Sequence, residues 1–199
     1  MNVTLAVEVF VTLIVVMDPV GTVPIFLSLV SGRPSRSAHA AAWQAVSVSL
    51  GVIVVFALFG QAILDYLGIT LPAMQCVGGL LLLLVALELL TGDESAPNFT
   101  GDTNVALVPL GTPLMAGPGA IVATMLFTRR VHDVSGGLGV ALGILGVHLV
   151  LWIAMRYSLP ILRVLRESGV LLITKISGVL LSAIAVQMVA DSIRAFIRG

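Results

Sequence analysis

One carboxylate, Asp18, lies near the middle of the first apolar segment of the sequence. Placing a carboxylate at the centre of a bilayer costs at least about 2.5 kcal/mol, so such residues usually face a cavity and mark a function. Pro19 follows directly and disfavours helical geometry at Asp18. We therefore expect Asp18 in an unwound stretch, where it could bind a substrate ammonium, carry a proton or help to coordinate sodium. The alternative is a structural role, in which the carboxylate caps the half-helix that follows.

A proline pattern occurs twice in the chain, each time within an apolar segment of membrane-spanning length. The first copy reads DPVGTVP and the second reads PLMAGPG. A proline inside a helix removes a hydrogen bond and clashes with the preceding turn. We expect both helices to break at mid-membrane, where freed backbone groups must face protein or a water-filled cavity. The paired prolines are Pro19 with Pro24 and Pro113 with Pro118.

Pro24 and Pro118 are the expected first-turn prolines of two new half-helices, because proline is favoured at that position. Thr22 and Gly117 would then lie near the two N-caps. A half-helix N-terminus presents free N–H groups and a partial positive charge, which suit a carboxylate. With Asp18 nearby, such a site would suit a zwitterion. The alternative is a pair of kinks that only permit close packing.

The substrate-binding residues predicted from the sequence all belong to these two breaks. Thr22 and Thr112 are candidate hydroxyl ligands, although helical hydroxyls also bond to their own backbone. The sequence has no nucleotide-binding loop, no histidine pair at metal-ligand spacing and no nucleophile motif, so we expect no enzyme, cofactor or metal site. The predicted binding residues are Asp18, Gly21, Thr22, Pro24, Thr112, Gly117, Pro118 and Gly119.

The elements that must position these residues are transmembrane helices. The chain has 199 residues, of which 58% are hydrophobic and only 10% are charged, and its mean hydropathy is +1.13. Soluble domains carry roughly 25% charged residues, so the partner of this surface is the lipid bilayer. The formal net charge is zero and no basic block suggests nucleic acid. We expect the first apolar segment to be retained as a helix and not cleaved as a signal peptide.

Six segments are apolar over about 20 residues, the length needed to span a bilayer. A polar linker at 92–104 divides them into two groups of three, within 1–91 and 105–199. We therefore predict an all-α membrane protein whose first and fourth helices are broken. The predicted helices are 4–30, 41–64, 69–90, 105–127, 136–155 and 170–190.

The two halves resemble each other, although similarity by chance between apolar segments is the alternative. The prolines of the two motifs align at an offset of 94 (113 − 19), and the third helices of the halves at an offset of 99 (178 − 79). The middle helices give no convincing register. Because three helices is an odd number, the second copy must insert upside down, as in many secondary transporters. The aligned pairs in the third helices are Gly79 with Gly178 and Ala86 with Ala185.

The distribution of arginines favours an N-terminus on the periplasmic or extracellular side, by five residues against four. His148 is alone in the fifth predicted helix, and we expect a packed, hydrogen-bonded histidine in preference to a proton relay. The arginines that favour this orientation are Arg33, Arg36, Arg156, Arg163 and Arg166, and those that oppose it are Arg129, Arg130, Arg194 and Arg198.

The run from Met17 to Phe26, together with the run from Pro113 to Ile121, resembles the MarC family of bacterial and archaeal inner-membrane proteins, also called UPF0056. The resemblance covers essentially the whole chain, and the family includes SnatA-type amino acid transporters. It implies a multi-pass inner-membrane protein that transports small neutral amino acids such as glycine, alanine and threonine. Thr22 and Thr112 differ from the residues usual in the family, which leaves the substrate open.

The predicted function is therefore secondary transport of a small neutral amino acid by alternating access, with a proton or sodium ion as the candidate coupling ion. Two alternatives stay open. One is a channel-like pore, which would give non-saturable flux. The other is a structural or regulatory membrane protein, which would not be stabilised by ligand. The sequence leaves open whether the protein forms a homo-oligomer.

Overall fold

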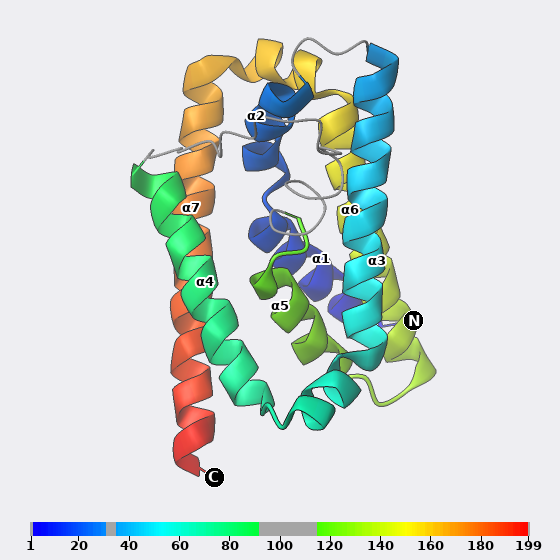
Figure 1. Cartoon of the computed structure of the whole chain (residues 1–199), viewed down its shortest axis with the longest axis vertical. Coiled ribbons are helices and arrows are strands. Elements are labelled where there is room, and N and C mark those ends of the chain that lie inside the picture. The colour runs from blue at the N-terminus through cyan, green and yellow to red at the C-terminus, as the bar shows by residue number, and fades with distance from the viewer. Residues whose placement is uncertain (1, 31–34, 92–114, 199) are drawn as a thin grey trace.

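The computed structural model describes residues 2–30, 35–91 and 115–198, and every element within these ranges is an α-helix (Figure 1). Within them, four stretches are long and apolar enough to cross a bilayer: Ser37–Leu67, Leu71–Thr91, Val134–Arg156 and Ser168–Ile197. The predicted linker, 92–104, lies outside the described residues. The helices are α1 (Val3–Met17), α2 (Pro19–Val30), α3 (Ser35–Leu67), α4 (Leu71–Thr91), α5 (Pro118–Thr128), α6 (Val134–Arg156) and α7 (Ser158–Arg198).

The first predicted helix is broken, as expected, and forms α1 and α2 on either side of Asp18. Within the fourth predicted helix, 105–127, the structure shows α5, which begins at Pro118. Residues 105–114 lie outside the described ranges. Figure 1 shows α2 and α5 running in opposite directions from the middle of the molecule. The two half-helices are therefore placed with their N-termini toward the centre.

The last helix is much longer than the predicted segment 170–190. Only Tyr157 separates α6 from α7, which begins at Ser158. Pro160 falls in the first turn of α7, where a proline is tolerated, so it does not stop the helix. The first part of α7 lies across one end of the bundle, and the rest descends beside α4 (Figure 1).

Glycines bring α4 and α7 together as antiparallel neighbours. A Cβ atom added at Gly79 would lie 2.8 Å from the Ala185 carbonyl oxygen, and one added at Gly178 would lie 3.3 Å from the Ala86 carbonyl oxygen. Gly79 and Gly178 are therefore points of close packing between the two helices. In membranes, small residues allow such close approach of helix backbones, and van der Waals packing then drives association.

A second close contact joins α1 to α6, which run in parallel. A Cβ atom at Gly139 would lie 2.8 Å from the Asn2 carbonyl oxygen, and one at Gly143 would lie 2.9 Å from the Ala6 carbonyl oxygen. The contact fixes α1 against a continuous membrane-spanning helix. The N-terminal half of α1, opposite to the end that carries Asp18, is therefore held against α6.

The core between the helices is apolar, and many large apolar side chains point outward, as expected for lipid-facing helices. Leu58 is 71% exposed and Phe59 is 58% exposed. Trp43 and Trp152 pack edge-to-face, with ring centroids 6.4 Å apart. The largest fully buried side chains are Phe26, Leu13, Met17, Ile53, Met115, Leu151, Met155 and Leu181.

Candidate functional site

Asp18 lies at the break between α1 and α2, in the left-handed backbone region (φ 38°, ψ 76°). Its N–H donates to the Ile14 carbonyl at 3.1 Å and closes the last turn of α1. Pro19 then begins α2, which suits a residue without an N–H to donate. Among the described residues, Asp18 is the one non-glycine residue with a positive φ.

The Asp18 carboxylate has two unlike oxygens. The backbone amides of Val20 and Gly21 and the hydroxyl of Ser177, on α7, lie next to the carboxylate. Oδ2 is nevertheless buried and has no hydrogen-bond partner within the described part of the chain. Buried polar atoms are nearly always hydrogen-bonded, so an unpartnered carboxylate oxygen is a candidate site for an ammonium group, a cation or a proton.

Gly21 makes room for this carboxylate. A Cβ atom at Gly21 would lie 2.2 Å from Asp18 Oδ2, which is closer than any side chain could tolerate. The glycine in the first motif is therefore required by the position of the carboxylate. Its inclusion in the predicted site agrees with this geometry.

Thr22 and Pro24 lie elsewhere than the sequence led us to expect. Thr22 is in the second turn of α2, not near its N-cap, and its Oγ1 donates to the Asp18 carbonyl at 2.8 Å. Pro24 lies inside α2, whose first residue is Pro19. The prediction that Pro24 begins the half-helix is therefore wrong. The physical reason is that the left-handed Asp18 already ends α1, so a new helix can begin at Pro19, the first proline. Pro24 is then tolerated inside α2, where it leaves the Val20 carbonyl without an N–H donor.

The start of α5 agrees with the prediction. Gly117 is the N-cap of α5, with an extended backbone (φ −62°, ψ 165°), and Pro118 is the first helical residue. Gly117 has no side chain and therefore provides no capping hydrogen bond to α5. The N–H groups of Gly119 and Ala120 have no partner inside the helix, as is general for the first turn. Thr112 lies outside the described residues.

Gly119 packs directly on α4. A Cβ atom at this position would lie 2.3 Å from Cγ of Leu82. Met115 and Ala116, just before the break, are buried in the same apolar core as Met17. The two breaks therefore belong to one packed centre, in which α1 contacts α5 and α2 contacts α7. Ser177 and Leu82 were missed by sequence reasoning, because only long-range packing brings them to the breaks.

His148 is a packed histidine, as predicted. It is 3% exposed; Nδ1 lies 2.8 Å from the Ile144 carbonyl oxygen and Nε2 lies 3.3 Å from Oγ of Ser49. The carbonyl can only accept, so Nδ1 carries the proton and Nε2 accepts from the serine. The pair joins α3 to α6 away from the two breaks.

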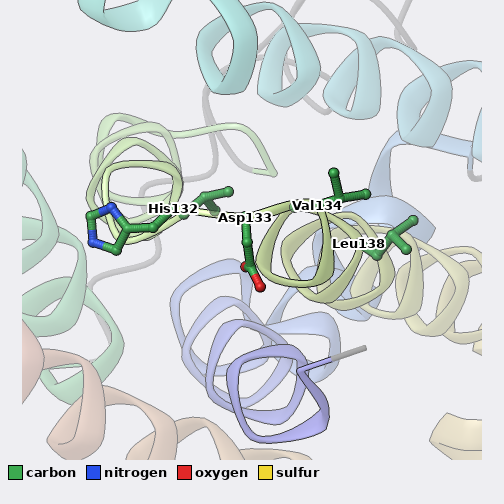
Figure 2. Close-up of a pocket in the computed structure, with 6 residues that line it drawn as sticks. His132, Asp133, Val134 and Leu138 are labelled. Carbon is green, nitrogen blue, oxygen red and sulfur yellow. The ribbon is translucent and has the colours of Figure 1, made fainter.

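Two surface cavities lie apart from the breaks. One, of about 620 Å³, is at the connection from α5 to α6, where the Asp133 carboxylate points away from Val134 and Leu138 (Figure 2). Asp133 caps α6 and accepts from the Ser135 hydroxyl at 2.7 Å and the Gly136 N–H at 2.9 Å. These two bonds, the hydroxyl first, hold the pKa of Asp133 below its usual value. Its role is therefore structural. The second cavity lies at the turn from α3 to α4.

Comparison with known proteins gives one consistent family. The model of the MarC family of integral membrane proteins matches residues 3–197. A UPF0056 membrane protein of Methanocaldococcus jannaschii is 33% identical, covering 90% of this chain and 91% of its own. The UPF0056 membrane protein YhcE of Escherichia coli is 31% identical, covering 96% and 92%. The UPF0056 inner membrane protein YhgN of Escherichia coli is 29% identical, covering 95% and 96%. No solved structure matches the chain.

Proposed function

Because the chain belongs to the MarC family of integral membrane proteins, we propose that it is a secondary transporter of small neutral amino acids of the glycine, alanine and threonine type. The observation that carries the proposal is Oδ2 of Asp18, at the break between α1 and α2, which is buried and has no partner among the described residues. Ionisable residues within membrane segments mark substrate or ion pathways by default. The names of the relatives describe membrane proteins and none names an enzyme.

In this proposal the two ends of the amino acid bind to different breaks. Asp18 binds the ammonium group, or carries the coupling proton or sodium ion. The amides of Val20 and Gly21 already lie next to the Asp18 carboxylate, so α2 has little capacity left for an anion. The substrate carboxylate therefore goes to the N–H groups of Gly119 and Ala120 at the start of α5, where the helix dipole is also favourable.

The inverted repeat is part of the proposal, and one sequence offset supports it. Ser49 and His148, which contact each other, are 99 positions apart. The same offset relates the pairs in α4 and α7, whose contacts are reciprocal: Gly79 packs on Ala185, and Gly178 packs on Ala86. Two copies related by a two-fold axis must make contacts of this reciprocal kind.

The offset of 99 also changes which prolines correspond in the two broken helices. Pro118 begins α5 as Pro19 begins α2, and these two prolines are again 99 positions apart. Pro19 is therefore the structural counterpart of Pro118, in place of Pro113. A single offset then covers all three helix pairs, including the middle helices, whose register could not be predicted from the sequence.

Alternating access would follow from rocking one repeat against the other around the two breaks, as in other transporters built from inverted repeats. We further propose that the protein lies in the inner membrane, as its relative YhgN does by name, with the N-terminus outside. The positive-inside tally of arginines supports this orientation.

Uptake into proteoliposomes tests the proposal. Wild type and Asp18→Asn are reconstituted side by side, and initial rates are measured with labelled glycine, alanine and threonine, with and without a proton or sodium gradient. We expect saturable uptake by wild type and loss of uptake by Asp18→Asn, because the amide cannot carry the charge that the ammonium or coupling ion requires.

The control is Asp133→Asn, a carboxylate outside the two breaks, which should transport at the wild-type rate if the variant is folded. Normal uptake by Asp18→Asn would remove Asp18 from the mechanism. Non-saturable flux in wild type would favour a pore. No uptake of any of the three by protein with a normal elution profile would contradict this substrate class.

A further inference from the structure

An open cavity of about 440 Å³ lies at the turn between α3 and α4, at the end of the bundle where α5 also ends, and most of its lining residues are exposed. Its polar lining consists of Gln61 and Asp65 from α3, Thr70 from the turn, and Arg129 after α5. The adjacent side chain of Tyr66 is 91% exposed and that of Leu67 is 60% exposed. The cavity is therefore at the edge of the span Ser37–Leu67, where lipid meets water.

The turn that shapes the cavity is closed by two backbone hydrogen bonds. Gly68 takes a left-handed conformation (φ +66°). Its N–H donates to the Asp65 carbonyl at 3.2 Å, and the N–H of Ile69 donates to the Leu64 carbonyl at 2.9 Å. This pair of bonds is a Schellman motif with glycine at the position that needs a positive φ. The floor of the cavity is the buried Leu71, which packs with Leu64 and Met125. The charged side chains are thus carried by fixed elements.

The cavity has a negative wall formed by Asp65, in the last turn of α3. Carboxylates are disfavoured there because the helix C-terminus carries partial negative charge. The one bond to the carboxylate is from the Gln61 side-chain amide, at 2.7 Å to Oδ1. A neutral amide does not cancel the charge, so a cation at this wall would be stabilised by both the carboxylate and the helix end.

The lining also carries positive charge, from Arg129. Arg129 contributes a guanidinium, and α4 starts beside it with its N-terminus, which Thr70 caps through a bond from the Ala73 N–H at 3.3 Å. Within the described ranges, the ion pairs are Arg130 with Glu8 and Arg194 with Asp191. Asp65 and Arg129 thus line the same cavity without forming an ion pair with each other.

We propose that this cavity binds a small zwitterion, with an ammonium group at Asp65 and a carboxylate or phosphate group at Arg129 and the start of α4. Two sources present this chemistry at a membrane surface: a free amino acid, and the phosphoethanolamine headgroup of a lipid. The site does not involve Asp18, and the inference does not depend on transport.

The test measures binding by the full chain, with two probes. Retention of phosphatidylethanolamine against phosphatidylcholine is measured by native mass spectrometry on protein released from nanodiscs that contain both lipids. Binding of labelled glycine is measured by equilibrium dialysis on protein that carries Asp18→Asn, which removes the other proposed ammonium site. Each measurement is repeated with Asp65→Asn and with Arg129→Gln.

The matched control is Arg130→Gln, which changes the neighbouring arginine, whose partner is Glu8 and which does not line the cavity. We expect each cavity variant to lower binding of at least one probe by about fivefold, the effect of losing one exposed charge contact, and the control to leave it within about twofold. A lipid effect alone identifies the headgroup, and a glycine effect alone identifies the amino acid. The proposal is overturned if neither probe responds to the cavity variants, or if Arg130→Gln has the same effect. Both measurements report binding and not transport, so a failure of the transport proposal would not change either of them.

Discussion

Asp18 has a combination of features that a capping carboxylate does not need. Its backbone is left-handed, a conformation that costs an L-residue roughly 1–2 kcal/mol, although aspartate tolerates it better than most residues. One of its oxygens is buried without a partner in the described structure. Strained backbone and an unsatisfied polar atom tend to persist where function requires them. At the residue scale, the site is one carboxylate whose Oδ2 occupies the space that Gly21 leaves free.

Gly21→Ala tests that arrangement. The added Cβ would lie 2.2 Å from Asp18 Oδ2, and the end of a side chain can move where backbone cannot. We expect the fold to survive while the carboxylate is displaced. Initial uptake should fall by roughly tenfold or more, because a displacement of about 1 Å in an active group commonly costs that much.

The control for this variant is Gly51→Ala, because a Cβ atom at Gly51 meets nothing within 4 Å. It should keep the wild-type rate of uptake. If Gly21→Ala transports as fast as Gly51→Ala, the position of the carboxylate does not matter for transport, and the role proposed for Asp18 loses its geometric basis.

Two membrane-spanning elements, α4 and α7, are held together by small residues. Lipid removes the hydrophobic advantage that would drive such a contact in water, so close packing must supply it. Lys175, on α7, donates to the Leu90 carbonyl near the end of α4, which satisfies a C-terminal carbonyl of that helix.

Gly79→Ala should weaken this helix pair. The new Cβ would lie 2.8 Å from a backbone oxygen, that of Ala185, which cannot move without α7. Overpacking of this kind costs about 1–3 kcal/mol, and we expect a lower midpoint of thermal unfolding in detergent. Gly137→Ala, whose nearest neighbour would be 3.8 Å away, is the control and should unfold at the wild-type temperature. Equal midpoints for the two variants would show that close packing at Gly79 contributes nothing.

For the whole molecule, the proposed arrangement is two inverted halves joined outside the described residues. An even number of crossings would place both termini on the same side of the membrane. The proposed crossings are six: the four continuous spans, the crossing broken at Asp18 and the crossing that contains α5.

Reporter fusions at the C-terminus test the orientation in a bacterial inner membrane. We expect an alkaline phosphatase fusion to be active and a green fluorescent protein fusion to be dark, because the arginine tally places the termini outside. The opposite pair of results would reverse the orientation while keeping six crossings. A fusion at the N-terminus that reports the other side from the C-terminus would contradict an even number of crossings.

The sequence by itself determined the membrane class, the helical fold and the break at Asp18, because hydropathy and proline act locally. It also predicted Pro118 at the start of α5 with Gly117 as its cap, since first-turn preferences depend on neighbouring residues alone. It placed the start of the first half-helix at Pro24, because local rules do not say which of two prolines a helix will accept inside it. Tertiary structure decided that point and brought Ser177 and Leu82 to the breaks. It also placed Arg129 and Asp65 in the lining of one cavity and set Ser49 against His148, because contacts between distant helices depend on how the helices pack, and no local pattern encodes them.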